Sequence, residues 1–112
     1  MSMITKNGVS SVESFNELSA ASKLVVIFGA SWCKPCAALK PVLLEISEEV
    51  AYESLPFIEL DVDTLGMDKI CNKYSVRGVP TILMLDKGKE VNRITGSCGT
   101  QKIREELNNF NK

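Results

Sequence analysis

A run of five apolar residues at positions 24–28 is the feature that most constrains how this chain can fold. No polar residue interrupts the run, so both faces of the strand it predicts must be covered by other elements. A helical pattern follows Gly29, and Pro41 inside it predicts a kink, since its ring clashes with the preceding turn. The apolar residues of that pattern, which recur at helical spacing, are Leu39, Val42, Leu43, Ile46 and Val50. A covered strand followed by an amphipathic helix predicts an α/β fold.

Four further segments extend this strand–helix unit. Ser10 and Glu13 form a capping-box pattern that opens a short helix with Val12, Phe15 and Leu18 as its buried candidates. Residues 57–62 read as a second strand. One face of a short helix follows, made of Met67, Ile70, Cys71 and Tyr74. A closing helix carries Ile103, Leu107 and Phe110 on one face.

Residues 81–85 and 90–95 predict a β-hairpin, because the segment 86–89 between them has turn composition. The strand–helix–strand unit implies a parallel pair with a right-handed crossover, and the hairpin adds an antiparallel pair. We therefore expect residues 1–112 to form a single domain, with a mixed sheet covered by helices.

The composition of the chain limits which classes of function it can have. The 112 residues carry a net charge of −1, without the concentrated basic patch of a nucleic-acid binder. No apolar stretch is long enough for a membrane span or the core of a signal peptide, so we expect a cytoplasmic protein in a reducing compartment. A structural disulfide is rare there, and four cysteines point instead to chemistry or metal binding. The chain has no histidine.

Two of the cysteines, Cys33 and Cys36, lie between the buried strand and the following helix. The helix N-terminus favours a thiolate, so the pKa of Cys33 should fall below the free value of roughly 8.5. Cys36, one turn later on the same helix face, should lie within bridging range and be the more buried. Pro35 is tolerated because an N–H in the first turn has no partner within the helix. An activated thiolate beside a sheltered thiol suits disulfide exchange.

Trp32-Cys33-Lys34-Pro35-Cys36 resembles the active-site motif of the thioredoxin family, and Gly78-Val79-Pro80-Thr81 resembles its cis-proline segment. Pro41, the turn at 86–88 and Gly96 also match the family pattern. The resemblance runs from about Phe15 to about Phe110. It implies a thioredoxin fold, with a mixed central sheet of four to five strands flanked by about four helices. It also implies a cis bond before Pro80.

The resemblance implies a protein-disulfide reductase that works as an electron carrier, with Cys33 as nucleophile and Cys36 as resolving thiol. These two cysteines would form the active-site disulfide. The substrate groove would be lined by Trp32, Val79, Pro80, Gly96 and Ser97. Disulfide-containing proteins would be the substrates, an NADPH-linked, flavin-dependent thioredoxin reductase would supply electrons, and the monomeric domain would need no bound cofactor.

The sequence departs from the family pattern at two positions on neighbouring predicted strands. The family usually has an aspartate six residues before the first motif cysteine, where this chain has Ile27. The lysine that commonly lies opposite is replaced by Glu59. We hypothesise that Glu59, alone or through a water, assists deprotonation of Cys36; the alternative is an ordinary solvated strand glutamate.

Lys34 stands where the family usually has glycine. Its ammonium should favour the Cys33 thiolate, and because a more stable reduced form is a weaker reductant, the pair should be somewhat more oxidising than in Lys34→Gly. Pro35 and Glu59 are the other residues expected to tune the redox potential. The alternative is a solvated lysine that contributes little.

The other cysteines have simpler interpretations. Cys71 belongs to an apolar helix face, which favours a small buried hydrophobe. Cys98 lies near the proposed groove and is either a reactive surface thiol or an inert residue at a helix start. A zinc site built from all four cysteines is disfavoured, because only one closely spaced pair exists. The competing function is a binding module that serves a partner protein without redox turnover. An oxidase or isomerase is a further alternative, but such proteins usually carry a secretory signal, and the sequence shows no such pattern.

Overall fold

The structure is a computed structural model that describes residues 15, 23–64, 66–96 and 99–111. The capping box at Ser10 and Glu13 lies outside the described residues, as do Val12 and Leu18. Phe15, predicted to be buried, is fully buried. The elements in chain order are β1 (Lys23–Gly29), α2 (Lys34–Ser47), the 3₁₀ helix η1 (Val50–Tyr52), β2 (Phe57–Asp61), α3 (Met67–Lys73), β3 (Thr81–Asp86), β4 (Lys89–Thr95) and α4 (Thr100–Phe110).

The four strands form one mixed sheet in the order β2-β1-β3-β4. β1 pairs in parallel with β2, which places Ile27 opposite Glu59. β1 also pairs antiparallel with β3, and β3 pairs antiparallel with β4. The predicted parallel pair and hairpin are therefore confirmed, and β1 occupies a central position with neighbours on both sides.

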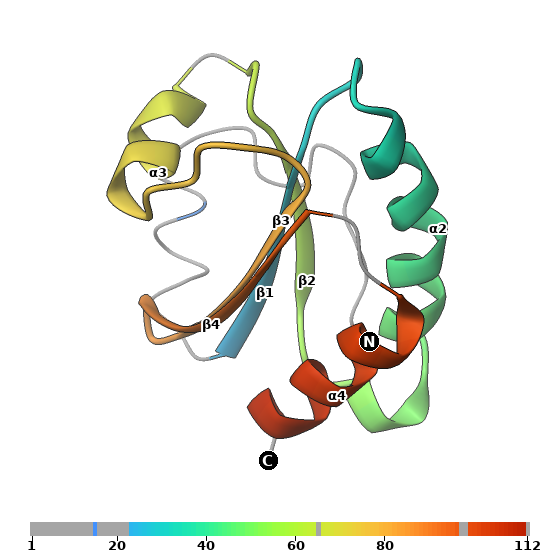
Figure 1. Cartoon of the computed structure of the whole chain (residues 1–112). Coiled ribbons are helices and arrows are strands. Elements are labelled where there is room, and N and C mark those ends of the chain that lie inside the picture. The colour runs from blue at the N-terminus through green and yellow to red at the C-terminus, as the bar shows by residue number, and fades with distance from the viewer. Residues whose placement is uncertain (1–14, 16–22, 65, 97–98, 112) are drawn as a thin grey trace.

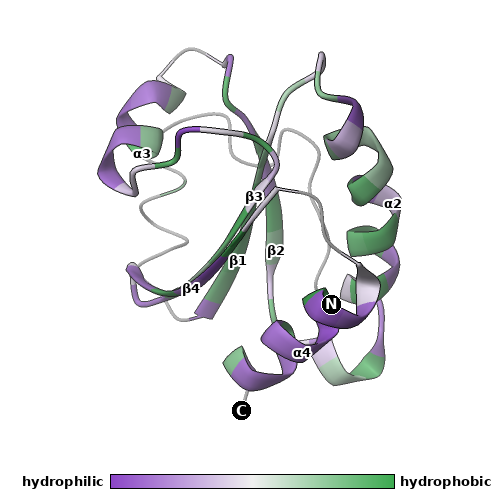
Figure 2. Cartoon of the chain, in the orientation of Figure 1, coloured by the Kyte–Doolittle hydropathy of each residue, from purple (hydrophilic) through white to green (hydrophobic). Residues whose placement is uncertain are grey.

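Helices cover both faces of the sheet, as the uninterrupted apolar run required. α2 and α4 lie on one side of it and α3 lies on the other (Figure 1). Alternate residues of β1 enter two separate cores: Val25 and Ile27 pack with α2 and α4, whereas Val26 and Phe28 pack with α3. Figure 2 shows the apolar colour concentrated on the central strands, with hydrophilic residues along the outer surface of α4.

The helix α2 ends earlier than its apolar pattern predicted. Leu39, Leu43 and Ile46 are buried as expected, and α2 runs through Pro41. Val50, however, is 81% exposed, so its prediction as a core residue was wrong. The helix stops at Ser47 and the backbone turns extended at Glu49, which takes Val50 off the helical stripe.

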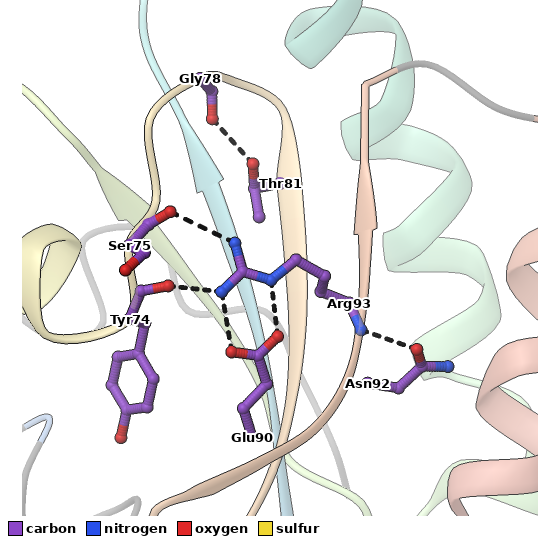
Figure 3. A network of polar contacts seen from close by, with 7 residues as sticks. All are labelled: Tyr74, Ser75, Gly78, Thr81, Glu90, Asn92 and Arg93. Atoms are coloured by element: carbon purple, nitrogen blue, oxygen red, sulfur yellow. Dashed lines mark hydrogen bonds and ion pairs between the residues drawn. The ribbon is translucent and has the colours of Figure 1, made fainter.

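A network around Arg93 of β4 holds the segment that precedes β3 (Figure 3). The guanidinium donates to the backbone carbonyls of Tyr74 and Ser75, and it forms a two-pronged ion pair with Glu90. At the other end of the segment, the Thr81 hydroxyl donates to the Gly78 carbonyl at 2.7 Å. Hydrogen bonds therefore hold the loop between α3 and β3 at both of its ends.

None of the helices within the described residues has the length and apolar character needed to cross a membrane.

Candidate active site

The cysteine pair lies at the carboxyl end of β1, where the sequence pattern placed it. Cys33 is the N-cap residue of α2, and its Sγ accepts a hydrogen bond from the backbone N–H of Cys36 at 3.2 Å. The two cysteines are joined by a disulfide, with their Cα atoms 5.3 Å apart. Pro35 occupies the first turn of α2, as expected. The first-turn N–H groups and the helix dipole therefore act on Cys33.

The expected difference in burial between the two cysteines is reversed. Cys33 is only 5% exposed, whereas Cys36 is half-buried and lines a pocket of about 370 Å³. Gly29 explains this opening, because a Cβ built there would lie 3.5 Å from both Cβ and Sγ of Cys36. A side chain at position 29 would therefore begin in van der Waals contact with the Cys36 sulfur.

Trp32 lies on the surface, with 67% of it exposed. Its indole Nε1 donates to Oδ2 of Asp63 at 2.8 Å, just beyond the end of β2. The backbone N–H of Asp63 donates to Oδ1 of Asp61 at 2.8 Å. The loop after β2 therefore orients the tryptophan. Asp63 is not predicted by the sequence, because nothing local to the motif signals it.

The Val79–Pro80 peptide bond is cis, as the resemblance implied. The Pro80 carbonyl accepts from the backbone N–H of Gly96 at 2.9 Å, which brings these two predicted groove residues together. Val79 is half-buried, Pro80 is buried and Gly96 is exposed. Gly96 has φ of +77°, a conformation that favours glycine. Ser97 lies outside the described residues.

Glu59 has a charged partner, Lys40, that was not among the predicted site residues. Its carboxylate lies 3.3 Å from Nζ of Lys40, and 24% of the Glu59 side chain is exposed. Both residues line the pocket beside Cys36. Lys40 follows Cys36 by four residues in α2, so helical spacing alone could have placed it on the same face. The glutamate is therefore paired with Lys40 and lies at the pocket beside Cys36.

The remaining predicted residues lie apart from this pocket. Lys34 begins α2 and is exposed. Cys71 is a free, half-buried thiol in α3, and burial, assisted by the negative charge of Asp68, raises its pKa. A raised pKa leaves little reactive thiolate at neutral pH. Cys98 is outside the described residues. Among the described residues, no group of three or more His, Cys, Asp or Glu side chains is arranged to hold a metal ion.

The comparisons with known proteins agree with this geometry. A family model described as Thioredoxin matches residues 7–109. The chain belongs to the thioredoxin family. It is 39% identical over 84 residues to thioredoxin-1 of Saccharomyces cerevisiae, an alignment that covers 74% of this chain and 78% of the yeast protein. It is also 34% identical over 84 residues to thioredoxin H2 of Arabidopsis thaliana, covering 74% of this chain and 60% of the plant protein.

A solved structure extends the similarity to the fold. The crystal structure of Malassezia sympodialis thioredoxin superimposes with a TM-score of 0.84 at 25% identity, covering 93% of this chain and 89% of that one. The mixed sheet and its flanking helices are therefore those of a thioredoxin fold. With a cysteine pair at bonding distance, this thioredoxin-family chain is a dithiol–disulfide oxidoreductase.

Proposed function

We propose that the protein reduces disulfides of other proteins by two successive thiol–disulfide exchanges. The Cys33 thiolate attacks one sulfur of the substrate disulfide, which forms a mixed disulfide and releases the other sulfur as a thiolate. Cys36 then attacks Cys33, the intramolecular disulfide forms, and the second substrate sulfur leaves. The substrate gains two electrons, and the cysteine pair loses them.

The N-cap position of Cys33 is the observation that carries this proposal. Its Sγ accepts the Cys36 N–H at the end of α2 where the helix dipole is positive. Both interactions stabilise the thiolate more than the thiol and lower the pKa of a cysteine in that position. Cys33 is accordingly the better nucleophile at neutral pH, and Cys36 is left to resolve the mixed disulfide.

Glu59 is proposed as the group that takes the proton from Cys36 during resolution. Both residues line the same pocket, which has room for water between them. The Lys40 ammonium lies 3.3 Å from the Glu59 carboxylate and holds it at the wall of the pocket. A carboxylate paired in this way is a positioned proton acceptor that replaces the aspartate absent at Ile27.

For the substrate polypeptide we propose a shallow surface formed by Trp32, Val79, Pro80, Gly96 and Ser97. The 67% exposure of Trp32 and the hydrogen bond between Gly96 and Pro80 support this assignment for three of the five residues. A thioredoxin reductase linked to NADPH would return the electrons. The protein would act as a cytoplasmic monomer that carries electrons without a bound cofactor.

Turnover of a protein disulfide tests this function directly. Reduction of insulin, with dithiothreitol as electron supply, should be catalysed by the wild type and lost in Cys33→Ser. Cys71→Ser is the matched control, because that cysteine belongs to α3 on the other face of the sheet, and it should keep its activity. Absence of turnover by a folded wild-type protein would overturn the proposal and favour a binding module that serves a partner protein.

A further inference from the structure

The pocket of about 370 Å³ is lined by Cys36 and not by Cys33. Its other lining residues include Gly29 at the end of β1, Lys40 in α2, and Glu59 and Asp61 in β2. A group in this pocket therefore meets the Cys36 side of the disulfide. The tryptophan and the cis-proline segment, which form the proposed surface for protein substrates, are not part of the pocket lining.

We propose that this pocket binds a zwitterionic low-molecular-weight thiol, which reduces the oxidised protein by attacking Cys36. The inference rests on the proposed function, since it uses the same disulfide, but it adds a second reductant with its own site. Proteins would exchange at Cys33, and small thiols would exchange at Cys36.

Access and leaving-group chemistry both favour attack at Cys36. Exchange requires the incoming thiolate to reach one sulfur and expel the other, and the sulfur whose thiol has the lower pKa leaves faster. Cys33 is 5% exposed, whereas Cys36 opens into the pocket. Attack on Cys36 expels Cys33 as a thiolate, which the N-terminus of α2 and the Cys36 N–H stabilise. Attack on Cys33 would expel a sulfur without that stabilisation.

The exchange balances with two equivalents of thiol. The first thiolate bonds to Cys36 Sγ while the Cys33–Cys36 bond breaks, and the electron pair of that bond goes to Cys33 Sγ. A second thiolate attacks the sulfur of the bound small molecule, which leaves as a symmetric disulfide and frees Cys36. The two thiols lose two electrons and their two protons, and the cysteine pair gains both.

The charges around the pocket select the chemical class of the thiol. Lys40 supplies an ammonium that suits a carboxylate, while Glu59 and Asp61 supply carboxylates that suit an ammonium. Lys40 and Glu59 already pair at 3.3 Å, so a ligand with a single charge would compete with one partner of this pair. A thiol that carries both charges can satisfy both partners.

Gly29 allows a direct test with a matched control. A Cβ at Gly29 would contact Cys36 Sγ at 3.5 Å, whereas a Cβ at Gly99 would meet nothing within 4 Å. Reduction of each oxidised variant by glutathione can be followed by the fluorescence of Trp32, the single tryptophan. Gly29→Ala should slow reduction about tenfold relative to Gly99→Ala, because the attacking sulfur is displaced from its line of approach. Equal rates in the two variants would overturn the proposal.

Two measurements on the wild type keep the proposal testable if a glycine variant fails to fold. Acid quenching during reduction, followed by mass-spectrometric fragmentation, should locate the glutathione adduct on Cys36; an adduct on Cys33 would overturn the proposal. At equal thiolate concentration, glutathione should react faster than cysteamine or 3-mercaptopropionate, which carry one charge each. Equal rates would show that the charges of the pocket do not recognise the thiol, and would overturn the proposal. Insulin turnover, measured in parallel, tests the proposed function separately.

Discussion

At the residue scale, the pairing of an apolar with a charged residue on two neighbouring strands is the most informative feature. Ile27 and Glu59 are register partners in β1 and β2, and Ile27 is only 6% exposed. The apolar residue extends the core beneath α2, and the carboxylate finds its counter-charge in Lys40. A charged group this close to the core needs such a partner, because an unpaired buried charge is costly. The charged member of this register pair therefore lies at the wall of the pocket beside Cys36.

Substitution of Glu59 tests its assigned role in resolution. Glu59→Gln keeps the shape of the side chain but removes the proton acceptor, so resolution by Cys36 should slow by about tenfold or more and its pH profile should change. Reaction of the reduced protein with an aromatic disulfide releases one chromophoric thiolate on attack and a second on resolution. Only the second phase should slow. Glu53→Gln, an exposed substitution elsewhere, is the control. An unaltered second phase would leave Glu59 as a structural partner of Lys40.

Lys34 is expected to set the redox potential of the pair. Its ammonium at the start of α2 stabilises the Cys33 thiolate, and a more stable reduced form makes the protein a weaker reductant. Lys34 is exposed, so the effect is screened. The wild type should have a potential roughly 10 mV higher than Lys34→Gly, measured by equilibration with glutathione. A wild-type potential equal to or below that of the variant would rule this role out.

At the element scale, the β3–β4 hairpin and the segment before β3 control where Pro80 lies. The hairpin turns through Lys87 and Gly88, with φ of +53° and +84°, and Asp86 pairs with Lys89. Two consecutive positive φ angles match the right-handed twist of the flanking strands. Gly96 at the far end of β4 then meets the Pro80 carbonyl. A change in the turn therefore acts on the element that carries a proposed groove residue.

The turn residues make a prediction about stability. Lys87 adopts a left-handed conformation that asparagine tolerates better, so Lys87→Asn should raise the free energy of unfolding by roughly 0.5–1 kcal/mol. Gly88→Ala forces a Cβ into the same region and should lower it by about 1 kcal/mol. Urea denaturation measures both changes. Shifts of the same sign in the two variants would contradict this description of the turn.

The ion pair of Glu90 with Arg93 predicts a pH dependence of stability. The hydrogen bond from Arg93 holds the pKa of Glu90 below its usual value near 4.5. A depressed pKa in the folded state adds stability above the unfolded pKa, and this stability is lost as the pH falls through the folded value. The difference in unfolding free energy between wild type and Glu90→Gln should thus be constant at neutral pH and shrink below about pH 4.5. A difference independent of pH would contradict it.

At the scale of the whole molecule, the sequence predicted what depends on local pattern. The apolar run of β1, the α4 face of Ile103, Leu107 and Phe110, and the hairpin all follow from periodicity and turn composition. The family resemblance supplied the cis bond before Pro80.

What the sequence did not predict depends on contacts between distant segments. The end of α2 before Val50 and the ion pair of Lys40 with Glu59 depend on how the elements pack. The bond from Trp32 to Asp63 joins residues 31 positions apart. The accessibility of Cys36 depends on the missing side chain of Gly29 in a neighbouring element. The sequence therefore located the reactive pair, whereas the direction from which each sulfur can be reached needed the fold.

The most direct test of the account is to trap the mixed disulfide on a protein substrate. In Cys36→Ser the resolving thiol is gone, so a protein with one reactive disulfide should remain attached after attack. Mass spectrometry of the digested complex should find the substrate on Cys33, and Cys33→Ser should trap none. A substrate attached to Cys71, or no complex from a folded Cys36→Ser protein, would contradict the assignment of Cys33 as the attacking thiolate.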